Sequence, residues 1–107
     1  CRGHLGSVYG EHLTLKTEIE GETYVFVYGH FVRGSTNNIL GGSDCVDVHP
    51  GDILGQMGST GKSDGVHLHF ERRGGYDNSL TLTQIMPEGD LVDEFSIGEL
   101  VVSCFDQ

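Results

Sequence analysis

The sequence predicts an all-β protein built around an antiparallel β-sheet core with long glycine-rich loops. Glycine makes up 17 of the 107 residues, and proline only two. Between the glycines lie short runs rich in β-branched and aromatic residues, a pattern typical of strands joined by turns. Several runs also alternate apolar with polar side chains, which places the two kinds on opposite faces of a strand. A chain of this length forms one domain at most.

The N-terminal part predicts a loop followed by a strand. Residues 1–10 carry three glycines and are expected to form a loop in which His4 is exposed. Residues 11–20 alternate, with the leucines on one side and His12 on the polar side. This pattern indicates a strand with one solvent-exposed face, so we expect His12 to be solvated.

A tight turn at residues 20–22 joins this strand to a second one, residues 23–31, and the pair is expected to form an antiparallel hairpin. The second strand carries on one face Tyr24, Phe26, Tyr28 and His30. An aromatic row of this kind is typical of a core face. It is also compatible with the wall of a cleft that has His30 at its mouth.

The middle of the chain is rich in turn residues. Residues 32–44 have turn composition throughout and predict a long loop. We expect a short strand at residues 46–48 and a turn at residues 49–52, with His49 as a turn residue. Residues 53–58 predict a short apolar strand that leads into a glycine-rich loop.

This loop and the strand after it, residues 55–71, carry the strongest functional signal in the chain. The alternating run that follows the loop has on one face Val66, Leu68 and Phe70. The opposite face carries His67 and His69, about 7 Å apart along the strand. Two imidazoles at this spacing can meet at one metal ion or one substrate atom. Two solvent-facing histidines on an amphipathic strand would give the same pattern.

The loop also looks like a phosphate-binding P-loop at Gly-Ser-Thr-Gly-Lys-Ser, residues 58–63. Gln56 stands where that motif requires glycine, and an alternating strand follows instead of a helix. We therefore do not expect nucleotide binding.

The C-terminal third is less regular. Residues 80–83 indicate an edge strand, residues 87–93 an acidic turn region and residues 97–105 a final strand. We therefore divide the chain into a β-sheet core, residues 1–86, and an acidic turn with a C-terminal strand, residues 87–107.

The formal net charge is −10, from 16 acidic and six basic residues. Nucleic acids are bound by clustered lysine and arginine, so this charge argues against a nucleic-acid partner. It argues equally against electrostatic attraction to anionic membranes, and no apolar run is long enough for membrane insertion. Acidic loops that bind divalent cations remain an alternative to a purely solubilising charge.

Three cysteines, Cys1, Cys45 and Cys104, leave the disulfide pairing open. A bridge between Cys45 and Cys104 is one possibility in an oxidising compartment, and lipid attachment at Cys1 is another use of a cysteine. Their spacing does not match a zinc ribbon, so we do not expect them to ligate a metal. Because the chain starts at Cys1 with no initiator methionine or signal peptide, we expect a processed product or a piece of a longer polypeptide.

A resemblance to a known family rests on Gly-Ser-Thr-Gly-Lys-Ser-Asp-Gly-Val-His-Leu-His-Phe-Glu, residues 58–71. This stretch closely resembles the signature of the M23 metallopeptidases, the lysostaphin-like or LytM-like endopeptidases. Tyr-Gly-His-Phe, residues 28–31, is similar to that family's Tyr-x-His-Leu segment, and residues 46–58 are similar to the approach to its loop. The resemblance covers roughly residues 7–73, with an insertion inside it.

The resemblance implies the M23 or LytM type of β-sheet core and a zinc-dependent endopeptidase. It implies His69 as a zinc ligand, and His30 and His67 as residues that act in catalysis beside the metal. The substrates implied are peptides of peptidoglycan. An extracellular or cell-envelope location follows, including the possibility of a phage particle.

One part of the family pattern is absent. The family takes its other two zinc ligands from an upstream His-x-x-x-Asp motif, but here His4 is followed four residues later by Val8, and His12 by Lys16. We expect the missing ligands to come from an N-terminal segment outside this sequence or from a partner in a protein assembly. The alternative is a degenerate, non-catalytic LytM-like module that acts as a binding or structural component.

Overall fold

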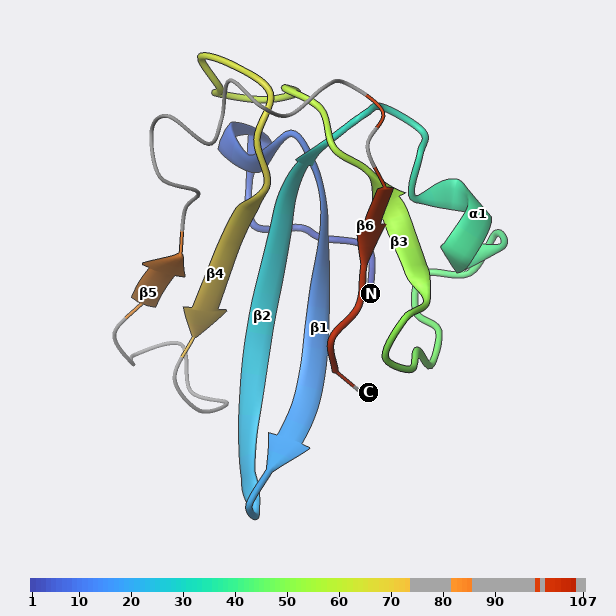
Figure 1. The fold of residues 1–107 in the computed structure, drawn as a ribbon, viewed down its shortest axis with the longest axis vertical. Helices are drawn as coiled ribbons and strands as arrows, with labels where there is room; N and C mark the ends of the chain where they lie inside the picture. The colour runs from blue at the N-terminus through green and yellow to red at the C-terminus, as the bar shows by residue number, and fades with distance from the viewer. Residues whose placement is uncertain (74–81, 86–97, 99, 106–107) are drawn as a thin grey trace.

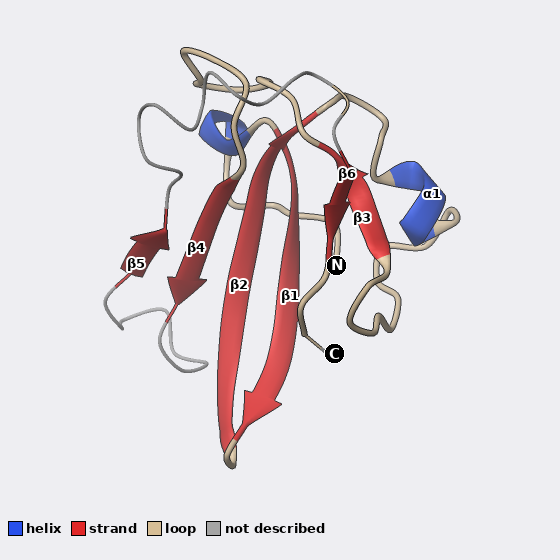
Figure 2. Ribbon diagram, in the orientation of Figure 1, coloured by secondary structure: helices blue, strands red, loops and turns tan. Residues whose placement is uncertain are grey.

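The computed structural model describes residues 1–73, 82–85, 98 and 100–105, and it confirms the prediction of an all-β, antiparallel fold. Its strands are β1 (Glu11–Ile19), β2 (Glu22–Phe31), β3 (Ile53–Gln56), β4 (His69–Arg73), β5 (Leu82–Ile85) and β6 (Leu100–Val102). They form a four-stranded sheet in the order β1-β2-β4-β5 and a two-stranded ribbon of β3 and β6 (Figures 1 and 2). The helical parts are single turns, a 3-10 turn (Ser7–Tyr9) and α1 (Asn37–Leu40). Within the described ranges, neither turn approaches the length and apolar character that a membrane crossing requires.

The predicted hairpin is confirmed as β1 and β2. Leu13 pairs with Tyr28 and Leu15 with Phe26, so that apolar side chains lie opposite one another on one face. Each fully buried side chain of this size contributes about 1.5–3 kcal/mol relative to an exposed one. In Figure 1 the hairpin is the longest feature of the fold, and its turn projects away from the loops at the other end of the sheet.

The hydrophobic core lies between this face of the sheet and the β3–β6 ribbon. Leu54 of β3 and Val101 of β6 are both buried in it, which confirms a strand in the last predicted segment. Aromatic rings extend the core, because Phe26 stacks on Phe105 with centroids 4.3 Å apart and on Phe70 at 5.3 Å. The buried residues of the core cluster are Leu13, Leu15, Phe26, Tyr28, Phe31, Leu40, Val48, Leu54, Met57 and Val101.

The alternation predicted after the glycine-rich loop is also confirmed. The apolar members pack against the core, namely Val66, Leu68 and Phe70. His69 pairs with Gly29 and Glu71 with Val27, on the opposite face of the sheet. A strand and not a helix follows the loop, as expected from the departure from the P-loop motif.

Some local predictions were wrong. Residues 46–48 form no strand, although Val46 and Val48 pack against or into the core. The long loop at residues 32–44 contains the single helical turn α1. The predicted edge strand at residues 80–83 is confirmed in its described part, because β5 covers residues 82–85, and the acidic turn at residues 87–93 lies outside the described residues.

The disulfide joins Cys1 to Cys45, a pairing that the sequence left open, and Cys104 is a free, exposed thiol. A Cys45–Cys104 bridge and lipid attachment at Cys1 are therefore both wrong for this structure. The bridge ties the N-terminal segment to the loop before β3. The neighbouring Arg2 N–H supports the same link, since it donates a 2.7 Å hydrogen bond to the Asp44 carbonyl.

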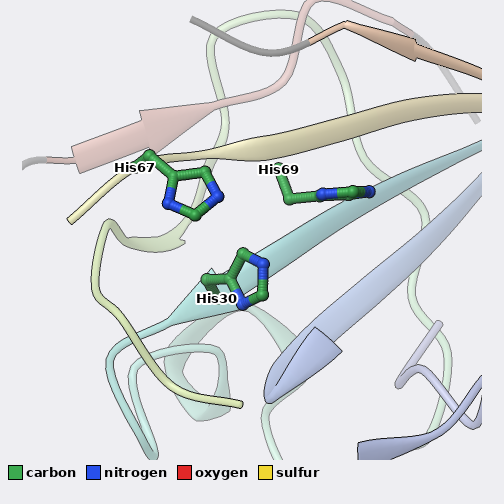
Figure 3. A group of neighbouring side chains, drawn as sticks. All are labelled: His30, His67 and His69. Atoms are coloured by element: carbon green, nitrogen blue, oxygen red, sulfur yellow. The ribbon is translucent and has the colours of Figure 1, made fainter. Parts of the chain in front are cut away.

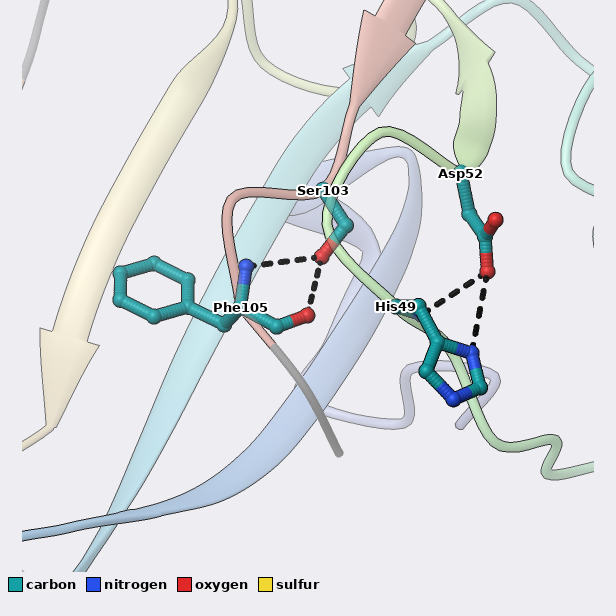
Figure 4. A network of polar contacts seen from close by, with 4 residues as sticks. All are labelled: His49, Asp52, Ser103 and Phe105. Carbon is teal, nitrogen blue, oxygen red and sulfur yellow. Dashed lines mark hydrogen bonds and ion pairs between the residues drawn. The ribbon is translucent and has the colours of Figure 1, made fainter.

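The end of β6 is held by the turn that precedes β3 (Figure 4). The Ser103 N–H donates to the Asp52 carbonyl at 2.9 Å, and the Gly51 N–H donates to the Ser103 carbonyl at 2.7 Å. The Ser103 hydroxyl donates to the Phe105 carbonyl, while the Asp52 carboxylate accepts the N–H of His49. His49 is thus a turn residue, as predicted, and this Ser, His and Asp group is a structural connection with no arrangement for nucleophilic attack.

Candidate metal centre

Three histidines from two distant parts of the sequence meet on the face of the sheet opposite the core (Figure 3). His30 comes from the end of β2, His67 from the loop before β4 and His69 from the start of β4. One ring nitrogen of each lies within 4.8 Å of the others. The three residues are only 4%, 9% and 8% exposed. The structure therefore brings together all three histidines that the sequence singled out, and it places His4 and His49 elsewhere.

His30 reaches this group because β2 contains a β-bulge. Glu11 and Leu13 are two residues apart in β1. Their partners in β2, Phe31 and Tyr28, are three residues apart, so β2 has one extra residue at this point. Such a bulge reverses the in-and-out alternation of the strand. Phe31 consequently joins Tyr28 in the core, while His30 turns toward the other histidines.

The predicted placement of His30 on the aromatic face of β2 was therefore wrong. A strict alternation would have put it beside Tyr28, away from His67 and His69. Instead its φ is +65°, in the left-handed region. For a residue with a Cβ this backbone conformation is unfavourable by roughly 1–2 kcal/mol. The surrounding contacts must offset this strain, and they place the imidazole in the histidine group.

Thr60 of the glycine-rich loop is the main contact that orients His30. The Nδ1–H of His30 donates a 2.6 Å hydrogen bond to the Thr60 carbonyl. The Thr60 hydroxyl in turn donates to the Phe31 carbonyl and accepts the N–H of Glu11. These bonds tie the loop to both strands of the hairpin exactly where the bulge occurs, so the loop and the bulge position His30 together.

The glycines of this loop allow it to lie directly on the segment around the 3-10 turn. Gly61 has a φ of +76°, and a Cβ at this position would lie 2.2 Å from the Gly10 nitrogen and 2.6 Å from the Val8 carbonyl oxygen. The Lys62 N–H donates to that same carbonyl at 2.9 Å. Only glycine fits this close approach of two backbones.

Hydrogen bonds also determine which nitrogen of each ring carries its proton. A carbonyl oxygen only accepts, so the bonds from Nδ1 of His30 to Thr60 and from Nδ1 of His67 to Gly65, at 2.9 Å, place N–H groups there. The Nε2 of His69 lies 2.8 Å from a carboxylate oxygen of Glu71. In the neutral rings the lone pairs then lie on Nε2 of His30 and His67 and on Nδ1 of His69. In Figure 3 each ring has a nitrogen on the side that faces the other two.

Two further residues of the site were missed by the sequence analysis as functional candidates, Glu71 and Tyr9. Glu71 has no exposed surface, and its Oε1 accepts the Tyr9 hydroxyl at 2.9 Å as well as the His69 bond. The Tyr9 ring also meets the His69 ring edge to face, at 5.3 Å. The alternation that linked His67 to His69 continues to Glu71 and could have identified it, whereas Tyr9 carries no signal in its local sequence.

His12 is the other correction, because it is buried and not solvated. It is 6% exposed and its ring lies 5.2 Å from the Tyr9 ring. Its Nδ1 bonds the Gly10 carbonyl and its Nε2 accepts the N–H of Leu5. The polar side of β1 is therefore covered near its start by residues 3–10, and both ring nitrogens of His12 serve to hold that segment.

The surroundings of His30 favour its uncharged imidazole. Burial lowers the pKa of His30 below its ordinary value, and the neighbouring histidines lower it further against the opposing effect of the Thr60 carbonyl. A neutral imidazole is the form that binds a metal. Imidazole nitrogen suits zinc better than it suits calcium or magnesium. The donor set therefore fits zinc.

Comparison with protein-family models, with curated proteins and with solved structures finds no match to this chain.

Proposed function

We propose that the chain is the catalytic part of a zinc-dependent endopeptidase of the M23 or LytM type, which cleaves peptide bonds in peptidoglycan. The observation that carries the proposal is the convergence of His30, His67 and His69 within 4.8 Å. In each ring, the nitrogen that faces away from the other two rings makes a hydrogen bond to a carbonyl or carboxylate oxygen. Metal-binding histidines characteristically donate their second N–H to a carbonyl or a carboxylate. Solvent-facing histidines on an amphipathic strand would show neither the burial nor these bonds.

The sequence resemblance supplies the roles. His69 is one ligand of the metal, and two further ligands come from a segment outside this sequence or from a partner in an assembly. His30 and His67 act on the substrate and water beside the metal. When bound, zinc supplies Lewis-acid chemistry, since it polarises a carbonyl and makes water a stronger acid. The Nε2 atoms of His30 and His67 carry lone pairs in the neutral rings, so either residue can accept a proton there and return it to the leaving amine. General acid–base catalysis of this kind contributes about 10²–10⁴-fold to rate.

The substrate class follows from the resemblance alone, in which these enzymes act on stem or cross-bridge peptides of peptidoglycan. Such substrates lie outside the cytoplasm, and an extracellular or envelope location is part of the proposal. The Cys1–Cys45 disulfide supports it, because disulfides persist in oxidising compartments.

The test is cleavage of purified peptidoglycan peptides by the zinc-loaded chain, with products identified by mass spectrometry. We expect His69→Ala to lose both zinc and cleavage. We expect His30→Gln and His67→Gln to keep zinc and to cleave at least about 100-fold more slowly. His49→Ala is the matched control, because His49 lies in an exposed turn outside the site.

A zinc-loaded chain that binds peptidoglycan peptides without cleaving them would contradict the proposal and favour the non-catalytic LytM-like module. Loss of zinc from His30→Gln and His67→Gln would instead show that all three histidines are ligands, and would contradict the roles assigned above.

A further inference from the structure

We propose that Glu71, held in place by Tyr9, is a positioning residue that fixes His69 in the tautomer with its proton on Nε2 and so presents Nδ1 to the metal. This inference rests on the proposed function for the role of the metal, but its effect on the tautomer is a property of the metal-free protein. It assigns a role to a buried carboxylate that the proposed reaction does not otherwise use.

The geometry of Glu71 is that of an acceptor built into the sheet. Glu71 lies two residues after His69 in β4, so both side chains stand on the same face of the strand. The His69 Nε2 lies 2.8 Å from Glu71 Oε1, within the range of a charge-assisted hydrogen bond. Because the two residues stand on the same face of one strand, their side chains can meet without any change in the backbone.

The complete burial of Glu71 makes its hydrogen-bond partners important. Glu71 is fully buried, and a buried carboxylate is strongly unfavourable unless donors surround it. The Tyr9 hydroxyl is one donor, at 2.9 Å to the same Oε1 that faces His69. Because the Tyr9 hydroxyl donates to Oε1, this oxygen is an acceptor in that contact. With the same oxygen as the acceptor at 2.8 Å from His69, the proton of the His69 ring lies on Nε2.

Tyr9 also limits how the His69 ring can turn. The two rings meet edge to face at 5.3 Å, and Gly29 lies opposite His69 in the sheet, where a Cβ would approach the His69 Cβ to 3.3 Å. The ring therefore has a carboxylate at one nitrogen, an aromatic edge at its side and little room below it. Orientation and tautomer are set before any metal arrives, which is the condition for tight binding with little reorganisation.

The first test is the protonation state of His69 in the metal-free chain, read from nitrogen-15 chemical shifts in long-range proton–nitrogen NMR spectra above the ordinary pKa of histidine. We expect His69 to carry its proton on Nε2. Glu71→Gln preserves the size of the side chain but can donate as well as accept, so we expect the population protonated on Nδ1 to rise. A wild-type His69 that is protonated on Nδ1 would overturn the inference.

The second test is zinc affinity, measured by competition with a fluorescent chelator, together with the visible absorption spectrum of the cobalt-substituted chain. We expect Glu71→Gln to weaken zinc binding by about 10–100-fold, the usual effect of removing such a partner. Tyr9→Phe should weaken it in the same direction but by less, and both variants should alter the cobalt spectrum. Tyr9→Phe keeps the ring contact, so it remains informative if Glu71→Gln does not fold.

The chain contains a matched control, a second tyrosine and glutamate pair outside the site. The Tyr24 hydroxyl donates to Glu22 at 2.9 Å on the exposed part of the hairpin. Glu22→Gln and Tyr24→Phe remove the same chemical groups and should leave the His69 tautomer and zinc affinity unchanged. If Glu71→Gln behaves like Glu22→Gln in both measurements, the inference is wrong. If the tautomer responds as expected but the wild-type chain neither binds zinc nor cleaves peptides, the proposed function fails while the positioning role stands.

Discussion

Replacing Gly61 with alanine tests how the glycine-rich loop holds the histidine group together. Any residue with a Cβ at a left-handed position is unfavourable by roughly 1–2 kcal/mol. At Gly61 the Cβ would also lie 2.2 Å from the backbone of Gly10, so the loop must move away. This movement would break the hydrogen bond from Lys62 to Val8 and the hydrogen bond from His30 to Thr60. Each is worth about 1 kcal/mol.

Gly21 offers a matched control, because it has a similar φ of +81° but nothing within 4 Å of its Cβ position. Gly21→Ala should show the backbone effect alone. Gly61→Ala should destabilise the chain by about 2 kcal/mol more, which corresponds to a Tm about 8 °C lower at roughly 4 °C per kcal/mol. Thermal unfolding followed by circular dichroism measures the difference, and equal Tm values for the two variants would refute the argument that the loop is pinned at Gly61.

Two further predictions concern the disulfide and His30. Replacing Cys1 and Cys45 with serine releases a loop with a sequence separation of 44, so we expect the free energy of unfolding to fall by about 4 kcal/mol. Cys104→Ser should change the free energy of unfolding by less than about 0.5 kcal/mol, because this thiol is free and exposed. Equal denaturant midpoints for the two variants would contradict this prediction. Because the pKa of His30 is lowered in the folded state, the unfolded chain binds more protons, and metal-free protein should lose stability as pH falls from about 6.5 toward that lowered value. His30→Asn should flatten this acid dependence in urea titrations, and an unchanged dependence would count against His30 as its source.

The alternation of apolar and polar residues was sufficient to predict the strands that build the sheet. It works for β1 and β2 because one face of each is buried in a single core, and the period-2 pattern then sets the register. It works at His67 and His69 for the same reason, since the apolar residues that alternate with them pack against the core. His67 and His69 were therefore predictable from the alternation, whereas His30 was added by the resemblance of residues 28–31 to the family's segment.

The arrangement of that group was not predictable from the alternation. His30 joins it through a bulge and a left-handed φ, and a backbone irregularity of one residue leaves no period in the sequence. His12 is buried because residues 3–10 fold back over β1, a long-range contact that local polarity does not report. The Cys1–Cys45 pairing likewise depends on which loop the N-terminal segment reaches.

The roles of Glu71 and Tyr9 were also not predictable from the sequence. Glu71 lay within the motif, but its role became visible only with its complete burial and its contact with His69. Tyr9 lies 62 residues away from it in sequence and has no local pattern at all. Residues that position a site are set by packing between distant segments, and a single sequence without its structure does not display them.

The measurement that tests the central claim most directly is the zinc content of natively purified protein, determined by elemental mass spectrometry and never after exposure to a chelator. The account predicts about one zinc per chain in the wild type and in His49→Ala, and none in His69→Ala. Wild-type protein without zinc would contradict it, because the three histidines that converge within 4.8 Å would then surround no metal.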